Sequence, residues 1–318
     1  MIPRQKYNGR PEGDLFSMNY KISEEERKFL EQYDITQFEQ PSLTVDIAVF
    51  AVRKTEDIEI DFRKDAPLEL SLLMVQRGTY PYRNLWALPG GFILPGEKVE
   101  ESAVRELRDE TSVENAYLRP FGTYSDAGRD PRGWIISNGF LALVDAKDYH
   151  VRGGSDAWAA EWFRIEVTCS EEHKTISGQD ISMLRVYQLK LENPRVPASL
   201  TAQIEQEKKF VRNHGSVNYN VISEEGFAFD HARIILDAFL ELQRQTQQDG
   251  RIVFDLMPDT YTLFRLQEVQ EIILGRKLLT PNFRRKIQPL VIETEQTETG
   301  AGHRPARLYR RNPEAFLI

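Results

Sequence analysis

The chain has 318 residues, with 41 Lys or Arg against 49 Asp or Glu, which gives a formal net charge of −8. This length favours two domains over one, and no apolar run is long enough to span a bilayer. The single cysteine, Cys169, excludes an internal disulfide and suits a reducing compartment, so we expect a cytoplasmic protein without membrane contact.

The charge is distributed unevenly along the chain. Residues 250–318 carry 11 basic and 8 acidic side chains, a net of +3, whereas the remaining residues carry a net of −11. Such asymmetry indicates two units with different partners. We therefore expect an N-terminal arm with a short helix over 1–40, a main domain over 41–249 and a basic unit over 250–318.

The first predicted elements lead into the main domain. Ser23 and Glu26 form a capping-box pattern that predicts a short helix ending at Tyr33. Residues 43–52 are almost continuously apolar and predict a strand buried on both faces. A second strand is predicted over 68–77, followed by a proline-punctuated loop.

A glycine turn at Gly90 leads into a predicted helix over 99–111. On this helix Glu106, Asp109 and Glu110 stand at positions i, i+3 and i+4 and therefore share one face. Mg²⁺ or Mn²⁺ takes oxygen ligands of this kind. A solvated acidic helix face is the alternative, but the preceding glycine turn and the fixed positions of acidic and basic residues favour a metal site.

The stretch from Gly91 to Val113 resembles the Nudix box, G-x5-E-x7-R-E-U-x-E-E-x-G-U, where U is bulky and aliphatic. The matching residues are Gly91, Glu97, Arg105, Glu106, Leu107, Glu110 and Val113. Asp109 replaces a Glu of the box and Ser112 replaces its late Gly.

The resemblance implies hydrolysis of a nucleoside diphosphate linked to another group, with Mg²⁺ or Mn²⁺ as cofactor. The expected ligands are Glu106, Asp109 and Glu110 together with the Gly90 carbonyl. We expect Glu97 and Arg105 to pair and hold the loop against the helix. The water-activating base is either Glu106 or a carboxylate outside the box, and both alternatives stay open.

Two further strands, over 117–125 and 134–144, are separated by the loop DAGRDPRG at 126–133. Arg129 and Arg132 in this loop, with Arg77 at the end of an earlier strand, are candidates for diphosphate contacts because guanidinium groups match phosphate oxygens. A turn held by salt bridges to Asp130 is an equally favoured role for the two loop arginines.

Strands around a central helix, with a further helix after them, fit the α/β/α sandwich expected of a Nudix domain. Residues 163–222 are interpreted as an insertion with a strand over 183–191, a helix over 199–212 and a strand over 216–222. A strong helix follows over 229–247. His231 at its start is either a metal ligand or a packed side chain, and packing is favoured.

The basic unit begins with a predicted helix over 262–274, which Gly275 terminates. Thr280 is expected to cap a second helix that has Pro281 at its first position. The spacing of Phe283, Ile287 and Leu290 turns these side chains inward. The outward side chains are then Asn282, Arg284, Arg285 and Gln288. A helix-turn-helix presents its recognition helix to the DNA major groove in this way.

The segment that follows predicts two strands around the glycine turn TGAG, which would form a wing. Arg304 and Arg307, with Arg310 and Arg311, are expected to reach phosphates or the minor groove. A helix-hairpin unit used only for dimer packing is the alternative.

Over about 40–160 and 226–311, the chain resembles the Nudix-related transcriptional regulators (NrtR-like), which join a Nudix domain to a C-terminal winged helix-turn-helix. The supporting stretches are PSLTVDIAVF, WALPGGF, GRDPRG, FAFDHA, NFRRK and RPARLYR. The resemblance implies a homodimer that binds duplex operator DNA, senses ADP-ribose or a related nucleotide, and controls NAD-related or sugar-metabolism genes. The alternative is a Mg²⁺-dependent hydrolase of the ADP-ribose pyrophosphatase type with a C-terminal dimerisation unit.

Overall fold

The computed structural model describes residues 23–55, 67–111, 116–145, 157–197, 199–212, 214–298 and 306–317. The helices and strands are, in chain order, α1 (Glu24–Gln32), β1 (Ser42–Lys54), β2 (Leu68–Arg77), β3 (Trp86–Ala87), β4 (Gly90–Phe92), α2 (Val99–Thr111), β5 (Tyr117–Tyr124), β6 (Ile135–Asp145), β7 (Ala157–Ser177), β8 (Asp180–Glu192), β9 (Leu200–Val211), β10 (His214–Glu225), α3 (His231–Gln248), α4 (Leu263–Leu274), α5 (Thr280–Ile287), β11 (Val291–Glu298) and β12 (Ala306–Arg311). Among the described residues, none of the helices has the length and apolar character needed to cross a membrane.

A ten-stranded sheet forms the centre of the main domain, in the order β10-β9-β8-β7-β2-β1-β6-β5, with β3 paired to β2 and β4 paired to β1. Strand β1 runs parallel to β6 and antiparallel to β2 and β4. Its central position explains its apolar sequence, because strands buried on both faces lose the usual alternation of polar and apolar residues.

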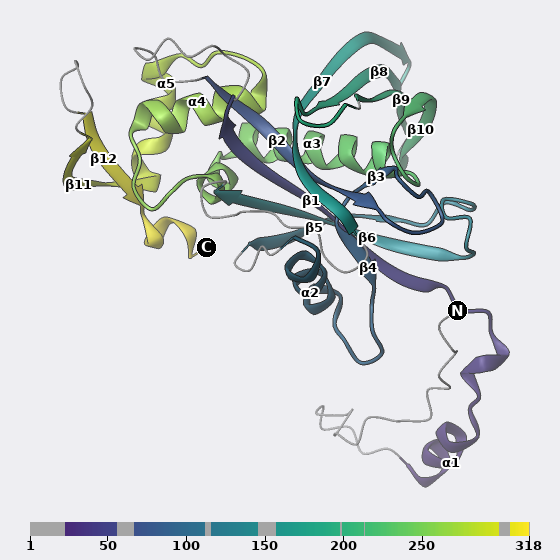
Figure 1. Ribbon diagram of the computed structural model, residues 1–318. Helices are drawn as coiled ribbons and strands as arrows, with labels where there is room; N and C mark the ends of the chain where they lie inside the picture. Colours follow the sequence, from purple (N-terminus) through teal and green to yellow (C-terminus); the bar gives the residue numbers. More distant parts are fainter. Residues whose placement is uncertain are drawn as a thin grey trace.

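Helices cover both faces of this sheet (Figure 1). Side chains of β1 alternate between two apolar clusters, as expected of a strand. Ile47 and Val49 join the cluster that contains Leu107 of α2, whereas Ala48 and Phe50 join the cluster that contains Ile235 of α3. The predicted α/β/α sandwich is therefore confirmed, with α2 in one outer layer and α3 in the other.

The segment interpreted as an insertion continues the central sheet. Strands β7, β8, β9 and β10 form an antiparallel meander, and β7 pairs with β2 of the main domain. The predicted helix over 199–212 is wrong, because residues 200–211 form β9. Every second residue of this strand is buried, namely Leu200, Ala202 and Ile204. The helix was predicted because the spacing of four residues between Leu200 and Ile204 fits both a helix and a strand.

Helix α1 begins after Ser23, and the predicted capping box with Glu26 is present. None of its residues is buried. It lies away from the sheet, on the N-terminal side of β1 (Figure 1).

The C-terminal unit contains α4, α5 and the β11–β12 hairpin. Helix α4 has Thr262 as its N-cap and ends at Gly275, which adopts a left-handed conformation with φ of 64°. The expected capping role of Thr280 is wrong, because Leu279 occupies the N-cap of α5. The Thr280 hydroxyl instead accepts a hydrogen bond from the Gln267 side chain at 3.3 Å.

Candidate functional site

The glycine turn packs β4 unusually close to β1 on one side and to α2 on the other. A Cβ atom at Gly90 would lie 2.1 Å from the Val45 carbonyl oxygen, and one at Gly91 would lie 2.4 Å from a carboxylate oxygen of Glu106. A side chain at Gly90 would collide with backbone atoms, so this position requires glycine, whereas a side chain at Gly91 would displace the Glu106 carboxylate. The turn is fastened to the helix by the expected ion pair, in which Arg105 Nε lies 2.7 Å from Glu97 Oε1. Its hydrogen bonds lower the pKa of Glu97 to about 2.

The carboxylates of α2 have three different environments. Glu106 accepts a hydrogen bond from Arg105, and Glu110 accepts one from the Gly90 N–H at 2.9 Å. Asp109 is half exposed and pairs with Arg108 at 2.9 Å. Burial raises the pKa of Glu110 to about 7. In the part of the chain that the structure describes, no three His, Cys, Asp or Glu side chains are grouped so as to hold a metal ion.

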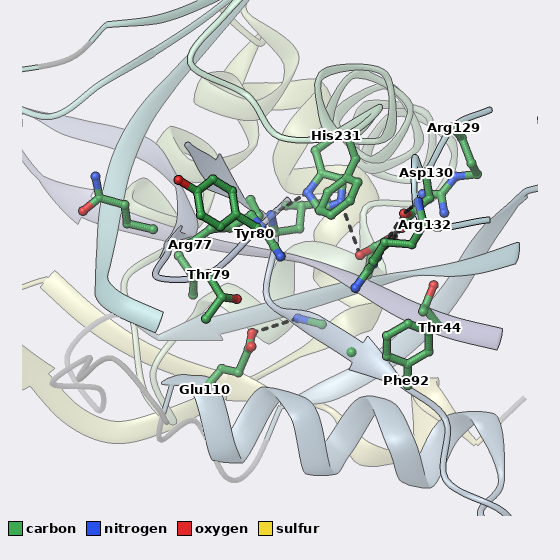
Figure 2. Close-up of a pocket in the computed structure, with 18 residues that line it drawn as sticks. Thr44, Arg77, Thr79, Tyr80, Phe92, Glu110, Arg129, Asp130, Arg132 and His231 are labelled. Carbon is green, nitrogen blue, oxygen red and sulfur yellow. Dashed lines mark hydrogen bonds and ion pairs between the residues drawn. The ribbon is translucent and has the colours of Figure 1, made fainter. Parts of the chain in front are cut away.

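A cavity of about 270 Å³ opens beside Glu110. Glu110 projects into it from α2, whereas Arg129, Arg132 and His231 lie on the opposite side (Figure 2). The cavity brings together predicted site residues from distant parts of the sequence, namely Arg77, Gly90, Glu110, Arg129 and Arg132. It also contains residues for which no role was predicted, namely Thr44, Asp46, Phe92 and Phe229.

Arg129 is held in a buried ion-pair network. Its guanidinium donates to both carboxylate oxygens of Asp230, at 2.9 and 2.7 Å, and to Asp46 at 3.5 Å. Burial opposes its charge, yet the bonds to Asp230 prevail and raise the pKa of Arg129 above its ordinary value. The salt bridge to Asp130 that was predicted for both loop arginines is made by Arg132, at 2.6 Å, whereas Arg129 pairs with Asp230.

Two arginines extend over aromatic rings in the cavity. The guanidinium carbon of Arg77 lies 4.8 Å from the centre of the Phe229 ring, and its Nε donates to the Pro81 carbonyl at 2.8 Å. The guanidinium carbon of Arg132 lies 5.0 Å from the Phe92 ring and 5.3 Å from the Phe229 ring.

His231 is a packed residue, as favoured from the sequence. It is buried, and its Nδ1 accepts a hydrogen bond from the Leu88 N–H at 2.8 Å. Its Nε2 lies 3.4 Å from Asp46, which also accepts a bond from the Ser137 hydroxyl. Burial lowers the pKa of the imidazole, so the ring is neutral and carries its proton on Nε2. The lone acid in the apolar strand, Asp46, was the sequence feature that could have predicted this network.

The C-terminal unit presents a basic helix to solvent. Phe283, Ile287 and Leu290 are buried, as predicted. The four side chains predicted to face outward are all exposed; these are Asn282, Arg284, Arg285 and Gln288. Helix α5 ends at Ile287, and Pro289 falls in the 3-10 turn that follows.

The hairpin supplies fewer free cations than its sequence indicates. Arg307 is exposed but pairs with Glu293 across the two strands. Arg311 pairs with Asp255 and lies 4.5 Å from the Phe316 ring, so it is engaged within the protein. Arg310 is exposed. Arg304 lies outside the described residues, as do Ser112 and Val113 of the box.

Helix α3 connects the cavity with the C-terminal unit. His231, its first residue, lines the cavity, and Asp230 immediately precedes it. Near its other end, Gln243 donates to the Ile273 carbonyl of α4 at 2.9 Å, and the Gln247 carbonyl accepts from Lys286 of α5 at 3.1 Å. A second connection runs through Asp255, which pairs with Arg119 of β5 and Arg311 of β12.

Comparisons with known proteins agree with this two-part architecture. A model of the NUDIX domain matches residues 62–185, and a model of the NrtR DNA-binding winged helix domain matches residues 253–311. The ADPR responsive transcriptional repressor NtrR of Acinetobacter baylyi is 29% identical over 289 residues, which cover 90% of this chain and 88% of that protein. An ADP-ribose pyrophosphatase of Methanocaldococcus jannaschii is 38% identical over 94 residues, 30% of this chain and 54% of that protein.

Solved structures share the fold along most of the chain. A MutT/nudix family protein from Enterococcus faecalis superposes with a TM-score of 0.63 at 23% identity, covering 91% of this chain and 93% of that one. Shewanella oneidensis NrtR, in complex with a 27mer DNA, superposes with a TM-score of 0.55 at 24% identity, covering 86% and 94%. The chain therefore joins a Nudix domain to a C-terminal winged helix domain of the NrtR DNA-binding type, the order of domains that the two family models give.

Proposed function

We propose that this protein is a transcriptional repressor that binds operator DNA through its winged helix and senses ADP-ribose, or a closely related nucleoside diphosphate sugar, in the Nudix cavity. The observation that carries the proposal is the presence in one chain of an arginine-lined cavity and a basic recognition helix, joined by α3. The similarity to an ADPR responsive repressor along 90% of the chain supports this assignment. NAD-related or sugar-metabolism genes are the proposed targets.

The cavity suits a diphosphate because arginine side chains from different elements line it. Arg77 and Arg132 line it from β2 and from the loop 126–133, and each can donate two parallel hydrogen bonds to phosphate oxygens. Arg129 contributes positive charge to the same wall, but its bonds to Asp230 fix its position. Isothermal titration with ADP-ribose tests this assignment, and an absence of binding would contradict it.

The proposed DNA contacts come from α5 and the wing. Arg284 and Arg285, with Asn282 and Gln288, would contact base edges in the major groove, while Arg304 and Arg307 would contact phosphates. The Arg284→Ala/Arg285→Ala double variant should lose binding to duplex DNA, and wild-type binding should weaken with rising salt. A double variant that binds as wild type would show that α5 is not the recognition helix. We further propose a homodimer, since two copies would match a two-fold symmetric operator.

Ligand binding alters DNA affinity only if the ligand prefers one arrangement of the winged helix over another. Helix α3 is the proposed carrier of this difference, because Asp230 and His231 at one end belong to the cavity network and Gln247 at the other end contacts Lys286 of α5. A shift of a rigid helix at the cavity would displace the recognition helix directly.

A second candidate function is hydrolysis of the same ligand. It is favoured by the retained acids of the box, by the Glu97–Arg105 ion pair, and by the similarity to an ADP-ribose pyrophosphatase. Under this function Mg²⁺ or Mn²⁺ would bind Glu106, Glu110 and the Gly90 carbonyl, and Asp109 would join only after leaving Arg108. Incubation with ADP-ribose and Mg²⁺ should then yield AMP and ribose 5-phosphate, and Glu110→Gln should abolish the turnover.

A further inference from the structure

Phe229 occupies a strained backbone position at the wall of the cavity. Its φ of 54° is left-handed, a conformation that bulky L-residues rarely adopt. The residues before it are fixed to β3, because Trp86 N donates to the Gly226 carbonyl at 2.9 Å and Ala228 N donates to the Trp86 carbonyl at 2.8 Å. Helix α3 begins two residues later. The chain therefore turns sharply at a residue that glycine would fill with less strain.

The side chain explains why a ring is kept at this position. The guanidinium carbons of Arg77 and Arg132 lie 4.8 and 5.3 Å from the ring centre, so one ring contacts arginines from two different elements. All three residues line the cavity. Asp130 pairs with Arg132 at 2.6 Å and neutralises part of its charge. The negative face of the aromatic ring compensates part of the repulsion that remains between the two guanidinium groups.

A second strained aromatic residue supports the ring. Tyr82 has a φ of 62°, and its ring contacts Phe229 edge-on with centroids 4.8 Å apart. Tyr82 belongs to the loop that wraps around Arg77, since Asn84 N donates to the Arg77 carbonyl and Arg77 N to the Leu85 carbonyl. Tyr82 and Phe229 thus both keep a strained backbone conformation and contact each other. Such strain is typical of functional sites, where side chains are held in place at some cost in stability.

We propose that Phe229 is a positioning residue that aligns Arg77 and Arg132 toward the diphosphate of the ligand. This inference rests on the proposed function of the cavity as a nucleoside diphosphate site. The ring acts before the ligand binds, because it holds the guanidinium groups of Arg77 and Arg132 at the cavity wall. Less side-chain entropy is then lost when the ligand orders these two arginines. When the ligand binds, the negative phosphate oxygens offset the repulsion between the two guanidinium groups, as the ring does in the empty cavity.

The test compares three variants of the full-length protein by isothermal titration with ADP-ribose and, separately, with inorganic pyrophosphate. Phe229→Leu keeps an apolar side chain but removes the aromatic face, and should bind both probes roughly tenfold more weakly, the effect expected from losing two cation–π contacts. Phe229→Tyr keeps the ring and should bind as wild type. Phe229→Gly relieves the backbone strain and should nevertheless bind as weakly as Phe229→Leu.

A double-variant cycle separates positioning from a general loss of structure. If Phe229 acts through the arginines, Phe229→Leu should cost less in an Arg132→Gln background than in the wild type. Additive losses, wild-type binding by Phe229→Leu, or failure of Phe229→Tyr to bind would each overturn the proposal. If the wild type binds pyrophosphate with this dependence but does not bind ADP-ribose, the proposed effector is wrong and the role of Phe229 stands.

Discussion

Removal of the Asp230 carboxylate should destabilise the main domain strongly. Asp230 makes two hydrogen bonds with Arg129, whose side chain is only 5% exposed. Removing one partner of a buried ion pair costs about 3–5 kcal/mol, because the remaining charge is left without compensation. Asp46 stays 3.5 Å from the guanidinium, so we expect the lower end of that range for Asp230→Ala.

No loss of helix capping adds to this cost, since the Asp230 side chain makes no capping hydrogen bond to α3. A loss of about 3 kcal/mol corresponds to a fall of roughly 6–12 °C in the melting temperature of a domain of this size. Urea denaturation followed by circular dichroism gives the free energy of unfolding, and differential scanning calorimetry gives the melting temperature.

Asp126→Ala is the matched control, because it removes an ion pair between the same loop and the same helix. Asp126 pairs with Arg233, but its side chain is 65% exposed, so its loss should cost less than about 1 kcal/mol. The double variant Arg129→Met/Asp230→Leu should recover much of the stability by replacing the buried pair with apolar groups. An Asp230→Ala variant no less stable than Asp126→Ala would refute the reasoning.

Three further outcomes are expected. Burial raises the pKa of Asp237 in the folded state above the unfolded value of ~3.8. The protonated carboxyl therefore contributes to the free energy of unfolding in full below pH ~3.8, and this contribution is lost as the pH rises through the folded-state pKa. The free energy of unfolding of Asp237→Asn minus that of wild type should therefore increase from pH 4 to pH 7, and an unchanged difference in urea titrations would contradict this. Glu293→Gln should strengthen DNA binding at low salt, because it releases Arg307 from its ion pair, and the salt dependence measured by fluorescence anisotropy should become steeper. Asp255→Asn should weaken the effect of ADP-ribose on DNA affinity, since it breaks a bridge between the Nudix domain and the wing; an unchanged effect in the same assay would exclude that bridge as a connection.

Most of the fold could be predicted because its elements show clear periodicity or terminal signals. The strand over 68–77 and the helix over 99–111 have the predicted bounds, and the helix stop at Gly275 is a local feature of the sequence. The error at 199–212 arose because polar residues such as Gln206, which is buried beside Tyr219, conceal the alternation of a strand.

The candidate site could be predicted only in part. Arg77, Arg129 and Arg132 were selected by residue type, and the cavity does contain them. The choice of Asp230 as partner of Arg129 could not be foreseen, because the two residues are 101 positions apart in the sequence. The role of Phe229 depends on a backbone angle and on two arginines from other elements, and none of these is a local property of the sequence.

The central claim is that the cavity and the winged helix are coupled. Its most direct test is a fluorescence anisotropy titration of the protein against duplex DNA from upstream of its own gene, at fixed salt, with and without saturating ADP-ribose. We predict that ADP-ribose weakens binding by at least fivefold, the lower end of typical coupling between two sites (about 1 kcal/mol). Tight DNA binding with the same affinity in both conditions would contradict the account.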